Sequence, residues 1–258
     1  DPLLDADSLL GRIDPRAEIR VGFNEDKIPF AYLNGRGTLV GYDVNMAHAL
    51  ARDLGVTIEF VRFDRSTLTD QINEDHFDVV LSGLIGTLER ARSMQHTESY
   101  MDVNLALVAP DYRSREFKSL DAIRAHGELK IGFVDLSRGF AGRLKKALPG
   151  VTLIEIKNNR DFFVGKHPEL DALLVSAEMG SAFTLMFPNY EVVVPDGLSV
   201  RLPLFYAIAN RDAPMRDFLE HWIDLRQKDG TAKEYYEHWV LGKTQKQQKP
   251  RWSVIRDQ

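Results

Sequence analysis

Strand-like and helix-like segments alternate along the chain, and this alternation restricts its fold more than any other feature. A strand with alternating apolar residues is predicted at 17–23, and a helix with one apolar stripe at 42–55. Further strands are predicted at 57–63 and 77–81, on either side of a short helix at 66–74. Strands that are separated by helices form a largely parallel sheet covered by those helices.

A second unit of the same kind follows the first. Its helix is predicted at 138–150, and the final part of the chain contains two amphipathic helices at 215–230 and 231–242. The strands of this second part are predicted at 128–134, 152–156, 171–176, 190–195 and 202–210. The chain is therefore expected to contain two α/β units in succession. Open α/β sheets bind ligands beyond the carboxyl ends of their strands, which here lead into loops 24–28 and 82–87.

Composition excludes several classes of function. The 258 residues carry a net charge of −5, so we expect no nucleic-acid partner, because such binding requires a basic face. No apolar run reaches the roughly 18 residues of a membrane helix. The absence of cysteine excludes disulfides, thiol catalysis and cysteine-ligated metals.

No catalytic or metal-binding motif is present either. The chain contains no nucleophile elbow, no phosphate-binding loop and no H-E-x-x-H sequence. We therefore expect no cofactor and no metal, because the histidines do not show the spacing of metal ligands. They occur at positions 48, 76, 96, 126, 167, 221 and 238.

The stretch "SGLIGTLER" at 82–90 raises a question about Arg90. It follows a buried strand, contains two glycines and is expected to lead into a helix. A cation in the first turn of a helix is mildly unfavourable, because the macrodipole makes that end positive. Some negatively charged group is therefore expected to compensate Arg90.

Four short motifs occur in a defined order between residues 18 and 241. They are P-F at 29–30, G-Y-D-V at 41–44, T-x-x-R at 87–90 and D-G-T at 229–231. In this order and spacing the chain resembles the extracytoplasmic, or periplasmic, solute-binding proteins of family 3, the amino-acid-binding type. The resemblance covers nearly the whole chain.

The resemblance implies the two-lobed α/β fold of periplasmic binding proteins, in which each lobe is a central sheet flanked by helices. Lobe 1 would comprise residues 1–108 and 206–258, and lobe 2 residues 109–205. Two hinge strands, at 105–109 and 205–209, would connect the lobes, which would close around a ligand.

The function implied by the resemblance is binding of a small carboxylate ligand outside the cytoplasm, without enzymatic activity. The partner would be a membrane transporter or a receptor. The polar tail at 243–258 is expected to be a tail or a membrane tether, and Trp252 would then lie just outside a membrane segment. A disordered tail is the alternative.

In this family the arginine of the T-x-x-R motif binds the ligand's α-carboxylate, which assigns that role to Arg90. A guanidinium matches a carboxylate geometrically. Thr87 is placed to cap the expected helix, and Gly83 allows the backbone to approach the ligand closely. The alternative is that Arg90 pairs with a surface acid, Glu89 or Glu98.

The chain departs from the family pattern at three positions. Lys27, in the loop that begins at Asn24, replaces the usual aromatic residue, and Ile85 replaces a small polar one. Ser176 stands where a carboxylate usually binds the ligand's amino group, and Glu178 lies two residues further on. Both Asn24 and Lys27 are candidate ligand contacts, although a solvated loop lysine is the alternative for Lys27.

The loop "VDLSRG" at 134–139 matches the family's anion-binding loop in lobe 2, which makes Ser137 and Arg138 candidate contacts. The alternative for Arg138 is a surface residue. Together with Arg90 and Lys27, Arg138 would favour a ligand with more than one negative charge, either an acidic amino acid or a dicarboxylate.

One enzyme remains as an alternative, because this fold also includes cyclohexadienyl dehydratases. Such an activity requires a carboxyl group in the cleft as general acid. Glu178 is the candidate for that role in this sequence.

Overall fold

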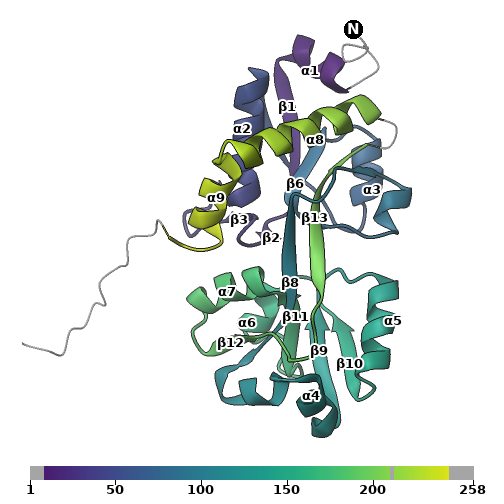
Figure 1. The fold of residues 1–258 in the computed structure, drawn as a ribbon, viewed down its shortest axis with the longest axis vertical. Coiled ribbons are helices and arrows are strands. Elements are labelled where there is room, and N and C mark those ends of the chain that lie inside the picture. The colour runs from purple at the N-terminus through teal and green to yellow at the C-terminus, as the bar shows by residue number, and fades with distance from the viewer. Residues whose placement is uncertain (1–8, 210–211, 244–258) are drawn as a thin grey trace, which may run out of the picture.

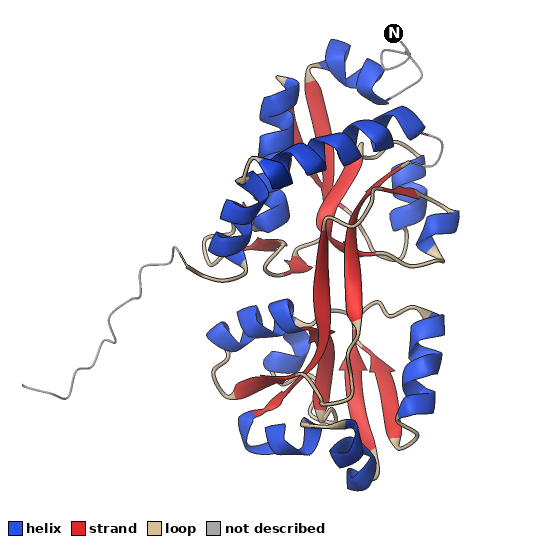
Figure 2. Ribbon diagram, viewed as in Figure 1, coloured by secondary structure: helices blue, strands red, loops and turns tan. Residues whose placement is uncertain are grey.

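The computed structural model describes residues 9–209 and 212–243. The tail expected at 243–258 therefore lies outside the described residues, apart from Lys243. Two lobes lie one above the other and are connected by two long strands that run side by side (Figure 1). Helices cover the outside of the sheet in each lobe (Figure 2).

Lobe 1 contains a sheet with the order β5–β1–β6–β13, in which β1 is parallel to both β5 and β6 and β13 is antiparallel to β6. Its main strands are β1 (Glu18–Phe23), β5 (Thr57–Arg62), β6 (Val79–Ile85) and β13 (Arg201–Ile208), with β7 (Gln95–His96) on β13. A small second sheet consists of β2 (Asp26–Lys27), β3 (Ala31–Leu33) and β4 (Leu39–Val40). The helices of this lobe are α1 (Leu9–Arg16), α2 (Tyr42–Leu54), α3 (Leu68–Asn73), α8 (Ala213–Lys228) and α9 (Thr231–Trp239).

Lobe 2 contains a sheet with the order β10–β9–β11–β8, and β12 pairs with β8. Its strands are β8 (Met101–Pro110), β9 (Leu129–Phe133), β10 (Val151–Glu155), β11 (Ala172–Ser176) and β12 (Tyr190–Val193). Its helices are α4 (Leu120–His126), α5 (Arg138–Ala147), α6 (Arg160–Phe163) and α7 (Ala177–Met186), and a 3-10 segment, η3, spans Asp111–Phe117. The two-lobed α/β architecture expected from the sequence is confirmed.

The two lobes are connected through the antiparallel pairing of β8 with β13. Residues 101–104 of β8 pair with residues 201–204 of β13. Beyond this stretch each strand joins a different lobe, because residues 105–108 pair with β11 and residues 204–208 pair with β6. The lobe boundaries expected at 108 and 206 fall inside these strands, and their role as hinges stays a prediction.

A buried carboxylate fixes the lobe-1 ends of the two connecting strands. Asp43, the second residue of α2, accepts hydrogen bonds from the hydroxyls of Tyr100 (2.9 Å) and Tyr206 (3.2 Å) and from the backbone N–H of Gly83 (2.5 Å). The two tyrosine rings stack on each other with centroids 4.3 Å apart. Burial raises the pKa of Asp43 to about 7, although these three donors oppose the rise.

Replacing Asp43 with alanine should destabilise the protein strongly, because three buried donors would lose their acceptor at about 1–3 kcal/mol each. We expect the free energy of unfolding in urea to fall by about 3 kcal/mol or more. Asp43→Asn retains an acceptor oxygen and should cost less. An alanine variant as stable as the wild type would contradict this account.

The wild type and the Asp43→Asn variant together test the raised pKa of Asp43. Between about pH 4 and pH 7 the folded protein retains a proton on Asp43 that the unfolded chain has lost. This contribution to stability therefore decreases as pH rises through that range. We expect the free energy of unfolding of the wild type, relative to that of Asp43→Asn, to decrease as pH rises through this range. A constant difference would contradict the prediction.

Candidate functional site

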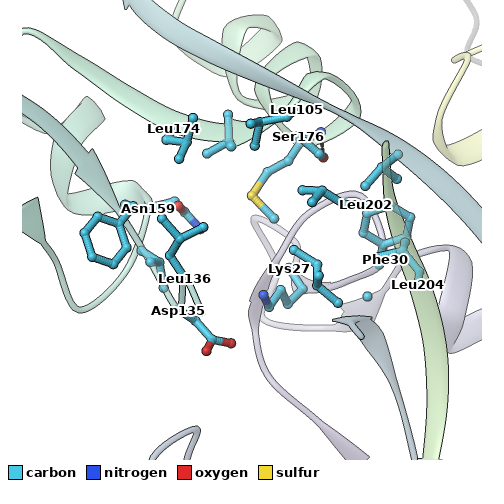
Figure 3. A pocket seen from close by; sticks show the side chains of 17 residues that line it. Lys27, Phe30, Leu105, Asp135, Leu136, Asn159, Leu174, Ser176, Leu202 and Leu204 are labelled. Atoms are coloured by element: carbon cyan, nitrogen blue, oxygen red, sulfur yellow. Dashed lines mark hydrogen bonds between the residues drawn. The ribbon is translucent and has the colours of Figure 1, made fainter. Parts of the chain in front are cut away.

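A cavity of about 60 Å³ lies between the two lobes, against the connecting strands β8 and β13. Figure 3 shows the 17 side chains that line it. They come from β2 and the loop after it, from β6, β8 and β13, from the end of β9 and the loop after it, from the residue before α6, and from β11 and the start of α7. One water requires roughly 10–15 Å³ by this measure, so the cavity accepts only a few non-hydrogen atoms in this conformation.

The lining is mostly apolar. Four of the lining residues have polar side chains, namely Lys27, Asp135, Asn159 and Ser176. Most of the others are leucine, valine, phenylalanine or methionine: Phe30, Val103, Leu105, Phe133, Val134, Leu136, Leu174, Val175, Met179, Leu202 and Leu204. Charges in such surroundings interact more strongly than charges in water.

Lys27 lies in this cavity as a buried cation. It is only 6% exposed, so the solvated-loop alternative is wrong. No hydrogen bond or ion pair joins its ammonium group to any residue that the structure describes. Burial lowers the pKa of Lys27 to about 8, and Arg65 contributes to the lowering while Asp135 opposes it. Lys27 is thus a desolvated cation that an anionic ligand would stabilise.

The group that compensates Arg90 is a carboxylate of the opposite lobe. Arg90 Nη2 lies 2.5 Å from Asp135 Oδ2, and Nη1 donates to the backbone carbonyl of Ile85 at 2.8 Å. The partner is therefore neither Glu89 nor Glu98. The pair spans the two lobes and lies beside the cavity.

The helix expected at Arg90 is absent, and this expectation was wrong. Residues Arg90–Arg92 form only a short 3-10 segment, η2, so no macrodipole of useful length acts on the guanidinium. Thr87 nevertheless accepts a hydrogen bond from the backbone N–H of Arg90 at 3.2 Å. Local backbone contacts, rather than a helix end, fix the position of Arg90.

Asp135 is a site residue that the sequence analysis did not select. Its backbone is left-handed, with φ 58°, a conformation that aspartate and asparagine adopt more readily than most residues. Burial would raise the pKa of Asp135, but Arg90 and Lys27 outweigh this effect and lower it. The carboxylate is thus ionised at neutral pH. The sequence contains one indication of its role, because Asp135 directly follows the predicted strand 128–134 at a carboxyl end of the sheet.

Two predicted contacts in lobe 2 serve as helix caps. Ser176 accepts from the N–H of Met179 at 3.1 Å and lines the cavity at the start of α7. Ser137 accepts from the N–H of Phe140 at 3.3 Å and lines an adjoining groove with Thr87 and Arg90. Each hydroxyl retains its hydrogen for donation to an acceptor.

Gly83 and Ile85 both line the cavity from β6. Gly83 has φ +56°, and a Cβ atom there would lie 2.8 Å from the ring of Phe30. A larger residue would therefore be strained and would also clash with the cavity wall. Ile85 contributes an apolar side chain where the family pattern has a small polar one.

Three predicted contacts line neither the cavity nor the adjoining groove of Thr87, Arg90 and Ser137. The Asn24 side chain accepts from Arg65 Nη2 at 2.8 Å in a groove outside the cavity. Arg138 is exposed at the start of α5. Glu178 accepts from the backbone N–H of Asn104 on β8, at 3.2 and 3.4 Å from its two oxygens.

A polar cluster connects the lobes between the cavity and that outer groove. Asp26 Oδ2 accepts from the backbone N–H of Asn159 at 2.9 Å, from its side-chain amide at 3.1 Å, and from Arg65 Nη2 at 3.1 Å. Arg65 Nη1 also donates to the carbonyl of Lys157 at 3.4 Å. Asp26 and Arg65 belong to lobe 1 and Asn159 to lobe 2, so this cluster is an interlobe contact.

The described ranges, 9–209 and 212–243, contain no cluster of three or more metal-ligating side chains. Within these ranges, none of the helices has the length and apolar character needed to cross a bilayer.

The family model of bacterial extracellular solute-binding proteins, family 3, matches residues 19–242. The chain belongs to this family. Two solved structures share its fold over nearly their whole length. An ancestral amino-acid-binding protein, a precursor of cyclohexadienyl dehydratase, is 26% identical with a TM-score of 0.78, covering 90% of this chain and 99% of that one. The solute receptor for L-cysteine of Neisseria gonorrhoeae is 25% identical with a TM-score of 0.77, covering 92% and 96%.

Curated relatives match over a shorter stretch. A probable histidine-binding protein of Neisseria gonorrhoeae is 27% identical over 121 residues, which are 47% of this chain and 44% of that protein. The cyclohexadienyl dehydratase of Pseudomonas aeruginosa is 30% identical over 121 residues, which are 47% of this chain and 45% of the enzyme. The aligned part of the chain therefore spans less than half of each of these relatives.

Asp26→Ala should weaken the closed arrangement of the lobes, because it removes the acceptor of the interlobe cluster. The native chain has no cysteine, so spin labels can be attached at Arg52→Cys in lobe 1 and Lys145→Cys in lobe 2. We expect pulsed EPR to show longer and more broadly distributed distances in the ligand-free variant.

Glu25→Ala is the matched control, because the ion pair of Glu25 with Arg62 lies within a single lobe. It should leave the distance distribution unchanged. An Asp26→Ala distribution identical to that of the wild type would show that the cluster does not stabilise closure.

Proposed function

We propose that this protein binds a small carboxylate ligand in the interlobe cavity, outside the cytoplasm, and presents it to a membrane transporter or a receptor. The observation that supports this most directly is Lys27, a buried cation that faces the cavity without an ion-pair partner among the described residues. Burying an unpaired charge is costly, so an anion that enters the cavity gains a strong electrostatic contact.

Arg90, at the edge of the cavity, also supports a carboxylate ligand. Its side chain is 14% exposed and is fixed by the carbonyl of Ile85, so the guanidinium is positioned in advance. A ligand carboxylate would meet Lys27 directly and Arg90 only by sharing it with Asp135. This arrangement favours one carboxylate in the cavity over two.

The expectation of an acidic amino acid or a dicarboxylate depended on three free cations. Arg138 is exposed, and Arg90 is paired with Asp135. Lys27 is the one unpaired cation among the described residues that line the cavity. A doubly charged ligand remains an untested prediction that this geometry does not favour.

Binding is better supported than the dehydratase alternative, although cyclohexadienyl dehydratase is among the relatives. A general acid must be protonated near the pH at which it works. Asp135 is the carboxyl group that lines the cavity in the described part of the chain, and its pKa is lowered. Glu178 contacts the backbone of β8 and does not line the cavity. Turnover of prephenate or arogenate would favour the enzyme.

Lys27→Met should weaken carboxylate binding roughly tenfold to a hundredfold, because it removes a charge-assisted contact of about 1.5–3 kcal/mol. Isothermal titration with butyrate, a compact carboxylate, measures this loss. The control is Lys157→Met, which removes the same charge from an exposed position outside the cavity. The Lys27→Met variant should unfold at the wild-type temperature or above, since it no longer buries an ammonium group. Unchanged butyrate affinity would contradict the proposal.

Affinity for butyrate should also fall as pH rises, because the anion binds the protonated form of Lys27. With a pKa of about 8, the protonated fraction falls about tenfold between pH 7 and pH 9. The Lys27→Met variant should lack this dependence. A wild-type affinity that is constant over that range would contradict the assignment.

A further inference from the structure

We propose that Asp135 is an internal counter-ion to Arg90, and that the ligand is therefore a monoanion with an apolar body and no ammonium group. This inference rests on the proposed function of the same cavity. It concerns the charge of the ligand, which neither the fold nor the relatives determine. The inference follows from the charges of the cavity and from the ion pair that they already form.

The first step is the charge balance of the site. Lys27 and Arg90 each contribute one positive charge and Asp135 one negative charge, and the neighbouring Arg65 and Asp26 neutralise each other as an ion pair at 3.1 Å, which leaves one positive charge unbalanced. The Arg90–Asp135 pair is satisfied internally at 2.5 Å. Lys27 and Asp135 project into the same part of the cavity from opposite lobes (Figure 3). A single ligand carboxylate at Lys27 would complete the balance without breaking the existing pair.

The second step is the absence of an acceptor for an ammonium group. Asp135 is the carboxylate that lines the cavity among the described residues, and it is already bound by Arg90. The family's usual position for that acceptor contains Ser176, whose oxygen caps α7. An ammonium group would have to compete with a guanidinium for Asp135 and would approach Lys27, a like charge.

The third step is the shape and polarity of the remaining space. Beyond Lys27 and Asp135 the lining is mostly apolar, with Phe30, Leu105 and Leu174 among it, and its other two polar side chains, Asn159 and Ser176, are uncharged. A second carboxylate placed there would lose its hydration and could gain only neutral donors, with no second unpaired cation to balance its charge. A short hydrocarbon chain would instead bury apolar surface. The small volume restricts the ligand to a few non-hydrogen atoms in this conformation.

Three ligands with the same four-carbon chain test this inference. Butyrate is a monoanion, 2-aminobutyrate a zwitterion, and succinate a dianion. We expect titration calorimetry at pH 7 to show that the wild type binds butyrate at least about tenfold more tightly than either of the others, because each of them carries a charge without a partner.

Asp135→Asn provides the second half of the test. Asparagine tolerates the left-handed backbone at this position, so the fold should be retained, and circular dichroism checks this. The variant frees Arg90, and the succinate affinity should rise about tenfold or more relative to butyrate. Asp121→Asn is the control, because it removes the same charge from a lobe-2 side chain that is 91% exposed. The control should preserve the wild-type order of affinities.

The outcomes separate the inference from the function on which it rests. If 2-aminobutyrate is the tightest ligand of the wild type and loses affinity in Asp135→Asn, then Asp135 binds an ammonium group. The inference would then be wrong while the proposed function would stand. If succinate is the tightest ligand of the wild type, Asp135 does not neutralise Arg90, and the inference is again wrong. If none of the three binds to either protein, both proposals fail.

Discussion

The buried carboxylate of Asp43 is the contact on which the geometry of the interlobe region depends. It accepts hydrogen bonds from Tyr100, which precedes β8, from Tyr206 on β13, and from the backbone of Gly83 on β6. The first two fix the connecting strands at their lobe-1 ends, and the third fixes a strand that forms the cavity wall. A single acceptor therefore positions both the connection between the lobes and one side of the site. Burying this carboxylate costs desolvation energy, and the same desolvation raises the pKa of Asp43.

Interlobe contacts occur on two sides of the cavity, and they differ in their relation to the ligand. The Asp26–Asn159 cluster, which includes Arg65, lies between the cavity and the outer groove and does not involve the guanidinium of Arg90. The Arg90–Asp135 pair connects the lobes with the same guanidinium that the family pattern assigns to the ligand. Closure of the lobes and the charge state of the site therefore share one ion pair.

The secondary structure was largely predictable, because each predicted element has a local signal. Helix α2 has its apolar residues on one face and ends at Gly55, whose φ of 70° terminates it in the left-handed conformation. Helix α7 was missed because the sequence "AEMGSAFTLM" is apolar almost throughout and therefore shows no clear stripe. The expected helix at Arg90 was wrong for a related reason, since the apparent helical pattern after Gly86 extends to only three residues of 3-10 structure.

The site was less predictable, because its charges are paired between segments far apart in the chain. Lys27 lines the cavity and Arg90 lies beside it. Both could be selected from the resemblance to the family, Arg90 as the arginine of the T-x-x-R motif and Lys27 as a departure from the pattern in the expected loop 24–28. Asp135 lies 45 residues from Arg90, and no local pattern indicates that the two meet. Without this partner, Arg90 counts as a free cation, and the positive charge of the cavity is overestimated.

The shared ion pair links the choice of ligand to the closure of the lobes. A ligand that draws Arg90 away from Asp135 gains one charge contact but breaks an interlobe contact and leaves Asp135 beside Lys27. A ligand that binds Lys27 alone keeps the Arg90–Asp135 pair and adds its own contacts to the closed state. A ligand stabilises closure only by the difference between its contacts in the closed and open states. By this criterion the proposed ligand is one that leaves the ion pair in place, and charge selectivity and lobe closure would then have the same physical origin.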